Sequence, residues 1–370
     1  DALPISAQYH SIKAEIDAAI GRTLESGGFI LGGEVATFET EVASYCQAAH
    51  GIGVASGTDA LHLALLACGI GQGDEVLTTP FTFIATAESI HKCGATPVFA
   101  DIEPHTCNMD LALLEQRLTS RTRAIVPVHL YGHPCDMTGL MQFATAHRLK
   151  VIEDCAQALG ASWRGKKVGS FGDAACLSFF PSKVLGAYGD GGMVVTSSAA
   201  VADHVRVLRS HGAHKKYFHD VPGFNSRLDA LQAAVLRVKL AHLDGWLERR
   251  RQIAGLYDRK IQGIDGISSL AALDGAYHVY NYYTIRVAGG AQRRDTTASY
   301  LKSQGIATSI YYPQSLHLQP IFAYLEYGRG DFPVSEAAQD ETLSLPMYPE
   351  LTEQQVDTVV AALQASQALR

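Results

Sequence analysis

Short apolar runs alternate with helical patterns between about residue 51 and residue 200, and this alternation constrains the fold more than any other feature of the chain. The runs that predict strands are, in chain order, GIGVAS, DEVLTTP, TPVFADI, AIVPVHL, LKVIEDC, AACLSFF and GGMVVTS. Helix-like segments such as TDALHLALLAC and GLMQFATAHR separate most of them. Strands joined by crossover helices make a mostly parallel sheet covered on both faces, so we expect an α/β fold. The runs are apolar throughout, as strands buried on both faces are.

The chain beyond this sheet predicts long helices and then a smaller domain. Residues 228–263 carry apolar side chains at helical spacing and many strong helix formers, which predicts one or two long helices. From YHVYNYYTIRV to the end, a few strand patterns and terminal helices predict an α+β unit. We therefore expect a large domain over residues 1–245 and a smaller C-terminal domain over residues 246–370.

Charge and composition point to a small-molecule partner. The net charge is −7 over 370 residues, and Lys and Arg are scattered, which argues against nucleic acid or a polybasic membrane patch as a partner. No apolar run approaches the roughly 18 residues of a spanning helix. The N-terminal stretch DALPISAQYHSIKAEID has neither the charged nor the apolar region of a signal peptide. We expect a cytoplasmic protein.

The cysteines do not predict a disulfide framework or a metal site. There are seven, with no CxxC pair, and an odd, scattered set is untypical of either. The segment VHLYGHPCD brings His129, His133 and Cys135 close in sequence, but it falls on a strand-to-helix loop without a second ligand group at matching spacing. We expect no metal.

Polar residues stand where predicted strands end, which is where sheets of this kind bind ligands. The segment ASGTD, residues 55–59, ends one strand and opens a helix, so it offers either an anion cradle for one phosphate or an ordinary helix cap. It lacks the glycine patterns of a P-loop and of a dinucleotide site. Asp154 ends LKVIEDC and either caps the next helix or meets a cation. Lys183 follows AACLSFF, where a solvated lysine is the ordinary alternative.

Together, a phosphate cradle, an edge carboxylate and a loop lysine are the groups that pyridoxal 5′-phosphate (PLP) requires. A lysine forms a Schiff base with its aldehyde, an aspartate pairs with its protonated pyridine nitrogen, and a helix N-terminus holds its phosphate. Phe83, after another predicted strand, either stacks on the ring or packs in the core. We therefore predict PLP as the cofactor.

The sequence resembles the DegT-type sugar aminotransferases, PLP enzymes that aminate keto groups on nucleotide-linked sugars. The resemblance runs nearly end to end and is carried by GGFILGGEVATFE, ASGTDALHLAL, PFTFIATAESI, VHLYGHPCDM, VIEDCAQALGA, SFFPSKVLGAYGDGG, FNSRLDALQAAVL and YYPQSLHLQP. It implies PLP fold type I, with a large, mostly parallel sheet between helices and a smaller C-terminal α+β domain.

The resemblance also implies roles for individual residues. Lys183 would be the Schiff-base lysine and the general base, Asp154 the partner of the pyridine nitrogen, and Gln157 a contact on the ring-hydroxyl side. Phe83 would lie on the ring. The other implied contacts are Gly57, Thr58 and Ser178 to the cofactor phosphate, Asn225 to the phosphate in the neighbouring subunit, and Arg227, Tyr311, Tyr312 and His317 to the substrate.

The NxR motif of Asn225 and Arg227 implies a homodimer with shared active sites. Arg227 and His317 suit a diphosphate or a sugar carboxylate, although a surface arginine looks the same in a sequence. Cys155 stands where many relatives have Ala, and we predict no function for it.

The activity implied is transamination with L-glutamate as the amino donor. Lys183 argues against the related dehydratases, which carry His at this position and work with an iron–sulfur partner. The motifs FPSK and LGAYGDGG around Lys183 resemble those of the C3 aminotransferases more than those of the C4 members. We therefore expect a 3-oxo sugar nucleotide, either a UDP-linked hexuronic acid or a dTDP-deoxyhexose. A C4 keto-sugar or cyclitol aminotransferase, and a PLP-binding regulator without turnover, stay open as alternatives.

Overall fold

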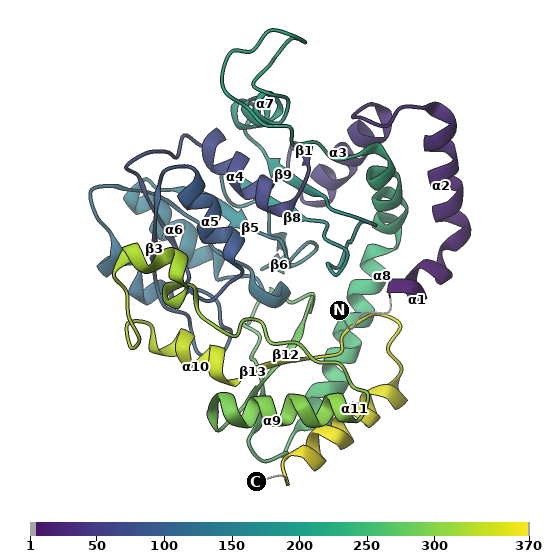
Figure 1. Cartoon of the computed structure of the whole chain (residues 1–370), viewed down its shortest axis with the longest axis vertical. Helices are drawn as coiled ribbons and strands as arrows, with labels where there is room; N and C mark the ends of the chain where they lie inside the picture. The colour runs from purple at the N-terminus through teal and green to yellow at the C-terminus, as the bar shows by residue number, and fades with distance from the viewer. Residues whose placement is uncertain (1–4, 369–370) are drawn as a thin grey trace.

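A seven-stranded sheet lies at the centre of the larger part of the computed structural model, which describes residues 5–368 (Figure 1). In spatial order its strands are β1 (His50–Val54), β9 (Gly192–Thr196), β8 (Ala174–Ser178), β5 (Lys150–Asp154), β4 (Thr122–Ile125), β2 (Glu75–Thr78) and β3 (Thr96–Phe99). β9 pairs antiparallel with β1 and β8, whereas the remaining neighbours pair parallel. The prediction of an α/β fold with a mostly parallel sheet is confirmed.

Helices cover both faces of this sheet because successive strand residues point to opposite sides. Val194 packs in one apolar cluster and Val195 in another, although they are neighbours in β9. The first cluster includes residues of α4 (Gly57–Ala67), α5 (Ile84–Lys92) and α7 (Ala199–Leu208). The second includes residues of α3 (Gly33–Tyr45) and of the long helix α8 (Ala230–Ile261), while α6 (Met137–His147) packs in a further cluster beside β5.

The N-terminal helices lie along α8. α1 (Ile5–Ser11) is followed by α2 (Lys13–Ser26), and Figure 1 shows α2 beside the upper part of α8. Ile12 and Ile16 pack with Val235 of α8 in a small apolar cluster. This contact ties the start of the chain to the helix that follows the sheet.

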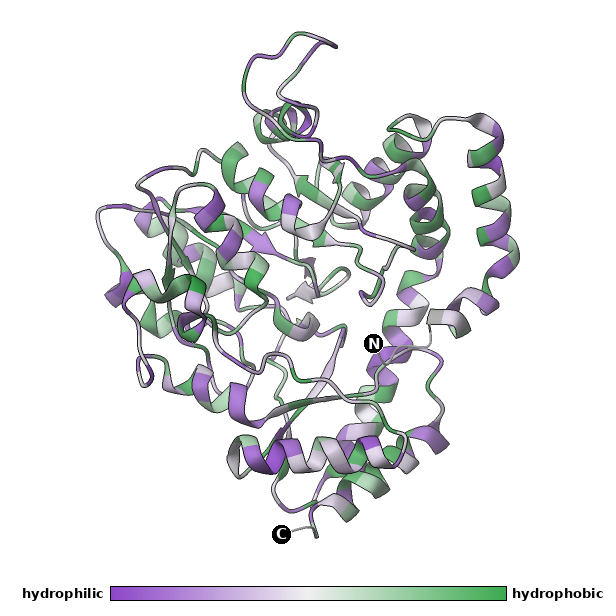
Figure 2. Ribbon diagram, viewed as in Figure 1, coloured by the Kyte–Doolittle hydropathy of each residue, from purple (hydrophilic) through white to green (hydrophobic). Residues whose placement is uncertain are grey.

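The smaller part of the molecule is built on a second sheet, of strands β10 (Ile267–Ser269), β12 (Tyr283–Val287) and β13 (Thr342–Leu345). Its helices are α9 (Gly290–Ser303), α10 (Pro333–Glu341) and α11 (Glu353–Ser366). Ile253 and Tyr257 of α8 enter its core beside Ile285. In Figure 2 both hydrophilic and hydrophobic residues are seen along α11. α8 therefore runs unbroken through residue 245, and the domain boundary stays a prediction.

Short elements complete the chain. A third sheet joins β11 (Ala276–Tyr277), β6 (Ser162–Trp163) and β7 (Lys166–Lys167). The 3₁₀ helices are η1 (Leu111–Leu113), η2 (Glu115–Arg117), η3 (Leu130–Gly132), η4 (Leu316–Leu318) and η5 (Pro320–Leu325). Within the described residues, none of the helices combines the length and the apolar character that a membrane crossing requires.

Candidate functional site

A cavity of about 490 Å³ opens where β5 and β8 end and the smaller part of the molecule approaches the sheet. Most of the predicted site residues line it: Gly57, Thr58, Phe83, Asp154, Gln157, Ser178, Lys183, Tyr311 and Tyr312. They come from four different strand ends or helix starts and from a loop of the smaller part. The sheet therefore gathers these residues as the strand-end argument expects.

The start of α4 comes very close to the end of β8. A Cβ atom added at Gly57 would lie 2.6 Å from Cβ of Ser178, so a side chain at this position would force the two elements apart. Ser56 caps the helix by accepting a hydrogen bond from the Asp59 backbone N–H at 3.1 Å. The remaining free N–H groups of the first turn and the positive end of the helix dipole favour an anion beside Gly57, Thr58 and Ser178.

Asp154 is the last residue of β5 and is buried. Its Oδ2 accepts a hydrogen bond from Oγ1 of Thr86 at 2.8 Å, and its Oδ1 accepts one from the Ala156 backbone N–H at 3.1 Å. Burial raises the pKa of the Asp154 carboxyl, while these hydrogen bonds and the positive charge of Lys183 oppose the rise. A cationic ligand group at this carboxylate would favour its ionised form, and a protonated pyridine ring meets that requirement.

Lys183 lies in a tight turn between β8 and β9. Its backbone N–H donates to the Phe180 carbonyl at 2.9 Å, and the turn closes where the Ala187 N–H donates to the Phe179 carbonyl at 2.7 Å. The side chain is partly exposed to the cavity, and burial of its amine lowers its pKa to about 8 against the opposing effect of Asp154. A lysine whose amine is partly unprotonated near neutral pH is a competent nucleophile and base.

Gln157, Phe83 and Tyr312 also line the cavity. Gln157 Oε1 accepts from the Tyr131 backbone N–H at 2.6 Å, and Gln157 Nε2 donates to the Tyr312 hydroxyl at 3.1 Å. The ring of Phe83 lies 6.1 Å from that of Tyr312, and Phe83 is 54% exposed. Phe83 is thus no core residue, and its ring is free to cover a flat ligand.

Three predicted residues do not line this cavity: Asn225, Arg227 and His317. Asn225 is exposed and pairs with Ser210 in an isolated bridge, while Arg227 is partly exposed. The His317 side chain is buried, with its ring 4.7 Å from that of Phe332 and Nε2 3.1 Å from Glu336. His317 therefore does not line the cavity of its own chain, because its ring packs in the core, and its contact with the substrate stays a prediction.

Several lining residues were not predicted. Thr86 lies one helical turn after Phe83, so the spacing on α5 could have indicated that it faces the cavity. Tyr282 lies in the YHVYNYYTIRV run. Asp190, Phe180 and Ser182 flank Lys183 on its loop. The position of Tyr282, whose ring centroid is 5.9 Å from Lys183 Nζ, depends on how the smaller part docks.

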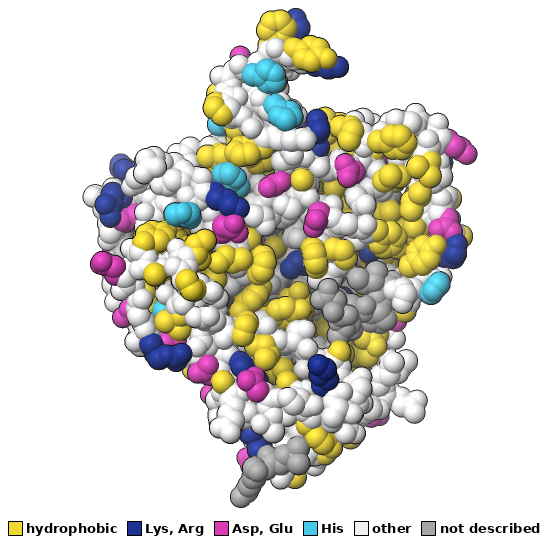
Figure 3. Space-filling model, viewed as in Figure 1, with side chains coloured by type: hydrophobic (Ala, Val, Ile, Leu, Met, Phe, Trp, Pro, Cys, Tyr) yellow, Lys and Arg dark blue, Asp and Glu magenta, His cyan; other side chains and the backbone are white. Residues whose placement is uncertain are grey.

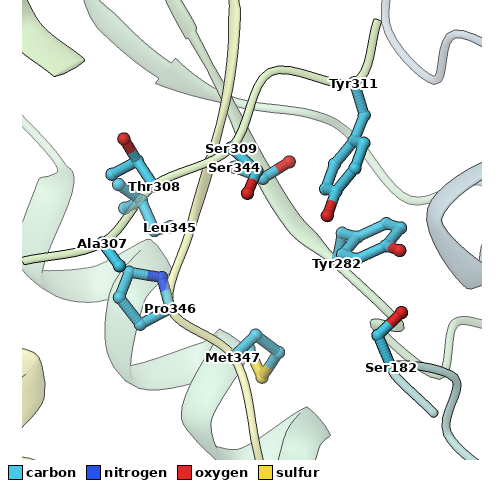
Figure 4. A pocket seen from close by; sticks show the side chains of 10 residues that line it. All are labelled: Ser182, Tyr282, Ala307, Thr308, Ser309, Tyr311, Ser344, Leu345, Pro346 and Met347. Atoms are coloured by element: carbon cyan, nitrogen blue, oxygen red, sulfur yellow. The ribbon is translucent and has the colours of Figure 1, made fainter. Parts of the chain in front are cut away.

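A small hollow of about 30 Å³ adjoins the cavity and shares Ser182, Tyr282 and Tyr311 with it (Figure 4). Its wall also carries the side chains of Thr308, Ser309, Ser344 and Met347. Its lining residues include three serines and a threonine, and its volume is that of one or two water molecules. Next to the cavity, on the side of the smaller part, there is thus a small recess without charged lining residues, which combines apolar and hydroxyl side chains.

A buried cluster behind Asp154 has the composition of a metal site. His129, Glu153 and Cys155 have ligand atoms within 4.8 Å of one another. Nδ1 of His129 accepts from the Cys135 backbone N–H at 3.0 Å, and Nε2 lies 3.2 Å from Glu153. Glu153 also accepts hydrogen bonds from three backbone N–H groups, of Gly169, Phe171 and Gly172. These bonds already engage the His129 and Glu153 atoms, which explains the cluster without a metal.

A model described as the DegT/DnrJ/EryC1/StrS aminotransferase family matches residues 10–364 of the chain. The solved structure of S. venezuelae DesV, in complex with a ketimine intermediate, has a TM-score of 0.96 and 43% identity. That comparison covers 100% of this chain and 98% of the other.

Two curated relatives are similar over nearly their whole length. A protein of Geobacillus stearothermophilus named "Pleiotropic regulatory protein" is 51% identical over 97% of this chain and 96% of its own. A protein of Acidithiobacillus ferrooxidans, named as a UDP-N-acetyl-3-dehydro-alpha-D-glucosamine 3-aminotransferase, is 47% identical over 97% of this chain and 95% of its own.

Proposed function

The chain belongs to the DegT/DnrJ/EryC1/StrS family of PLP-dependent aminotransferases, and from this premise we propose that it transfers the amino group of L-glutamate to a nucleotide-linked 3-oxo sugar. The observation that carries the proposal is the pairing of Lys183 and Asp154 in one cavity with the glycine cradle at Gly57. These are the groups that PLP chemistry needs, on the edge of the sheet where ligands bind.

The cavity residues fit the cofactor in size and chemistry. Gly57, Thr58 and Ser178 would hold the phosphate, Asp154 the pyridine nitrogen and Lys183 the aldehyde. Phe83 would cover the ring, and Gln157 would face the ring hydroxyl. When bound, PLP supplies an aldehyde that exchanges amines and a ring that accepts an electron pair.

Lys183 moves the proton in this proposal. Its Nζ, with a pKa of about 8, would accept the proton from the donor's α-carbon, and in the second half-reaction it would deliver a proton to the sugar carbon that receives the nitrogen. Asp154, held by the hydroxyl of Thr86, would place a negative charge beside the ring nitrogen. The aromatic side chains of Phe83, Tyr282 and Tyr312 line this space and would limit the access of water once a cofactor covers them.

The names of relatives support carbon 3 as the sugar position that receives the amino group. The 47% identical relative is named for a 3-dehydro sugar, and further names place the amino or oxo group at carbon 3 of a dTDP- or UDP-linked sugar. The sequence around Lys183 favours the same carbon. The sugar and the nucleotide are not specified by the cavity, whose charged residues are Lys183, Asp154 and Asp190 among those described.

We further propose that the active form is a homodimer with shared sites. Lys183 is the one cation among the described residues that line the cavity, yet the phosphates of cofactor and substrate are anionic. Asn225 and Arg227 lie outside the cavity of their own chain and are accessible, so a second copy can receive them. Exposed apolar side chains nearby, among them Ile30, Phe180 and Phe224, suit such an interface.

A comparison of acceptors tests the proposed reaction. The purified enzyme with PLP and L-glutamate is offered 3-oxo and 4-oxo sugar nucleotides and a keto-cyclitol, and mass spectrometry follows the amino product and 2-oxoglutarate. We expect amination of the 3-oxo sugar nucleotide at a kcat/KM at least about tenfold above the others, a difference of about 1.4 kcal/mol. Preference for a 4-oxo sugar or a cyclitol would contradict the proposal.

A regulator without turnover is the second candidate, because the 51% identical relative is named as a regulatory protein. Such a protein needs no proton-transfer residue, whereas Lys183 with its lowered pKa and Asp154 meet in one cavity here. The two candidates differ in one product: a regulator would bind PLP but release no 2-oxoglutarate from glutamate.

A further inference from the structure

Two helical turns of α8 hold the loop that carries Lys183. Gln232 accepts from the Tyr188 backbone N–H at 2.8 Å and donates to the Tyr188 carbonyl at 3.3 Å. Seven residues later, and therefore on the same face of the helix, Lys239 donates from Nζ to the Gly186 carbonyl. From the smaller part, Asn281 Oδ1 accepts from the Val184 backbone N–H at 3.2 Å.

Lys239 is an unusual group to find there. It is 1% exposed, and no carboxylate of a described residue lies within ion-pair distance of it. Its amine lies 5.2 Å from the ring centroid of Tyr188. Burial lowers its pKa to about 8 against the opposing effect of the Glu350 charge. A buried amine without a carboxylate in direct contact destabilises a fold unless its other contacts compensate. The hydrogen bond to Gly186 is the one polar contact that the described residues offer it.

The position of Gly186 is coupled to the position of Lys183 through the turn that contains both residues. A Cβ at Gly186 would lie 2.3 Å from the Pro181 carbonyl oxygen, so the turn folds back tightly onto the residues before Lys183. Hydrogen bonds at Phe180 and Ala187 close the same turn on both sides. A displacement of the Gly186 carbonyl is therefore expected to move the Lys183 backbone, because close packing and hydrogen bonds fix the turn.

We propose that Lys239 is a positioning residue for transamination: its hydrogen bond to the Gly186 carbonyl sets the place from which Lys183 presents its amine to the cofactor opposite Asp154. Lys239 touches neither cofactor nor substrate, since it does not line the cavity. The proposal rests on Lys183 being the lysine that bonds the cofactor.

The test compares four variants with the wild-type enzyme. Lys239→Met removes the donor at similar length, Lys239→Arg keeps a donor and a charge, and Gln232→Ala releases the same loop at Tyr188. Ile253→Ala is the matched control, because it opens a cavity in the distant part of the same helix. The readouts are the free energy of unfolding, kcat and KM for glutamate, and the pH titration of the visible absorption band of the bound cofactor.

We expect Lys239→Met to lower kcat at least about tenfold with KM for glutamate changed less than about threefold, because a misplaced catalytic group slows the reaction step. We also expect the titration midpoint of the visible band to shift by at least about half a pH unit, since that midpoint reports the surroundings of the Lys183 nitrogen. Lys239→Arg should recover part of both effects, and Gln232→Ala should move both in the same direction. Ile253→Ala should lose stability with neither change.

Unchanged titration and kcat in Lys239→Met would overturn the proposal, and so would equal changes in Ile253→Ala. If Lys239→Met does not fold, the same decision is made on Gln232→Ala and Lys239→Arg. A Lys183→Ala enzyme that keeps the wild-type visible band would instead refute the role of Lys183 itself, so the two failures are distinguishable.

Discussion

Lys183 should leave a signature in the stability of the cofactor-free protein. Its pKa is about 8 in the folded chain, against a reference value of 10.5. Between these values the unfolded chain holds a proton that the folded chain does not, so stability rises with pH from about 8 to 10.5. Below pH 8 the buried charged amine costs the fold about 3 kcal/mol.

Lys183→Met removes this cost. We expect the variant to exceed wild type in free energy of unfolding by up to about 3 kcal/mol at pH 7 and to lose the advantage as the pH approaches 10.5. Denaturant unfolding of both cofactor-free proteins at pH 7, 9 and 10.5 measures the difference. A difference that does not vary with pH would mean that the amine is solvated in the folded protein.

Asp154 should control turnover more than cofactor attachment. Asp154→Asn keeps the shape of the side chain and one acceptor oxygen for Thr86 or Ala156, but it removes the charge expected opposite the ring nitrogen. We expect kcat to fall by about 10²–10³ while Lys183 still bonds the cofactor, as losing a charge aimed at the reacting centre does elsewhere. Asp190→Asn is the control, because Asp190 lines the same cavity. Equal losses in both variants would contradict the specific role of Asp154.

At the level of single residues, the sequence predicted those whose chemistry depends on lying at the end of a strand. Asp154 and Gly57 stand where a strand or helix boundary was readable, and Lys183 follows the next strand. Thr86 was missed because its role depends on which way α5 faces, and Tyr282 because it depends on domain docking. His317 was assigned to the substrate from the family resemblance, whereas in the structure its imidazole lies against Glu336 in the core.

The start of α4 is where the cofactor phosphate is expected to bind. Gly57→Ala would place a Cβ 2.6 Å from Ser178, so α4 and β8 must separate where the phosphate is expected. We expect PLP affinity to fall at least about tenfold, a loss of about 1.4 kcal/mol. Gly33→Ala is the control, because Gly33 also opens a helix but has nothing within 4 Å of its Cβ position. Absorbance titration with PLP measures both variants, and equal affinities would show that the cradle does not hold the phosphate.

Among the elements, those with long apolar or helical patterns were predictable. The seven principal strands and α8 follow directly from such patterns. The reversed direction of β9 was not predicted, although the connection from β8 holds only residues 179–191 and contains no crossover helix, which allows antiparallel pairing. The two-residue strands β6, β7 and β11 carry no periodic signal, since a pair of residues has no pattern to detect.

On the scale of the whole molecule, one segment stands away from the body. Residues 212–224 project at the top of Figure 1, and Figure 3 shows basic and apolar side chains gathered there. Tyr217 is 80% exposed and Phe218 62%, beside Lys215 and Lys216. Aromatic side chains so exposed suit contact with another chain, and Asn225 follows this segment directly.

The proposed sharing of sites is testable by complementation. Asn225→Ala and Lys183→Ala homodimers should each be nearly inactive. After mixing and subunit exchange, half of the dimers are mixed and each has one intact site, so about a quarter of wild-type activity should return. Subunits that keep complete sites of their own would regain nothing, and that result would contradict a shared site.

The most direct measurement is the visible absorption spectrum of the PLP-loaded enzyme before and after addition of L-glutamate, with release of 2-oxoglutarate measured in the same sample. The account predicts a band from the cofactor bonded to Lys183 that bleaches as 2-oxoglutarate appears, and neither event in Lys183→Ala. A band that persists in glutamate without 2-oxoglutarate would contradict the proposed transamination.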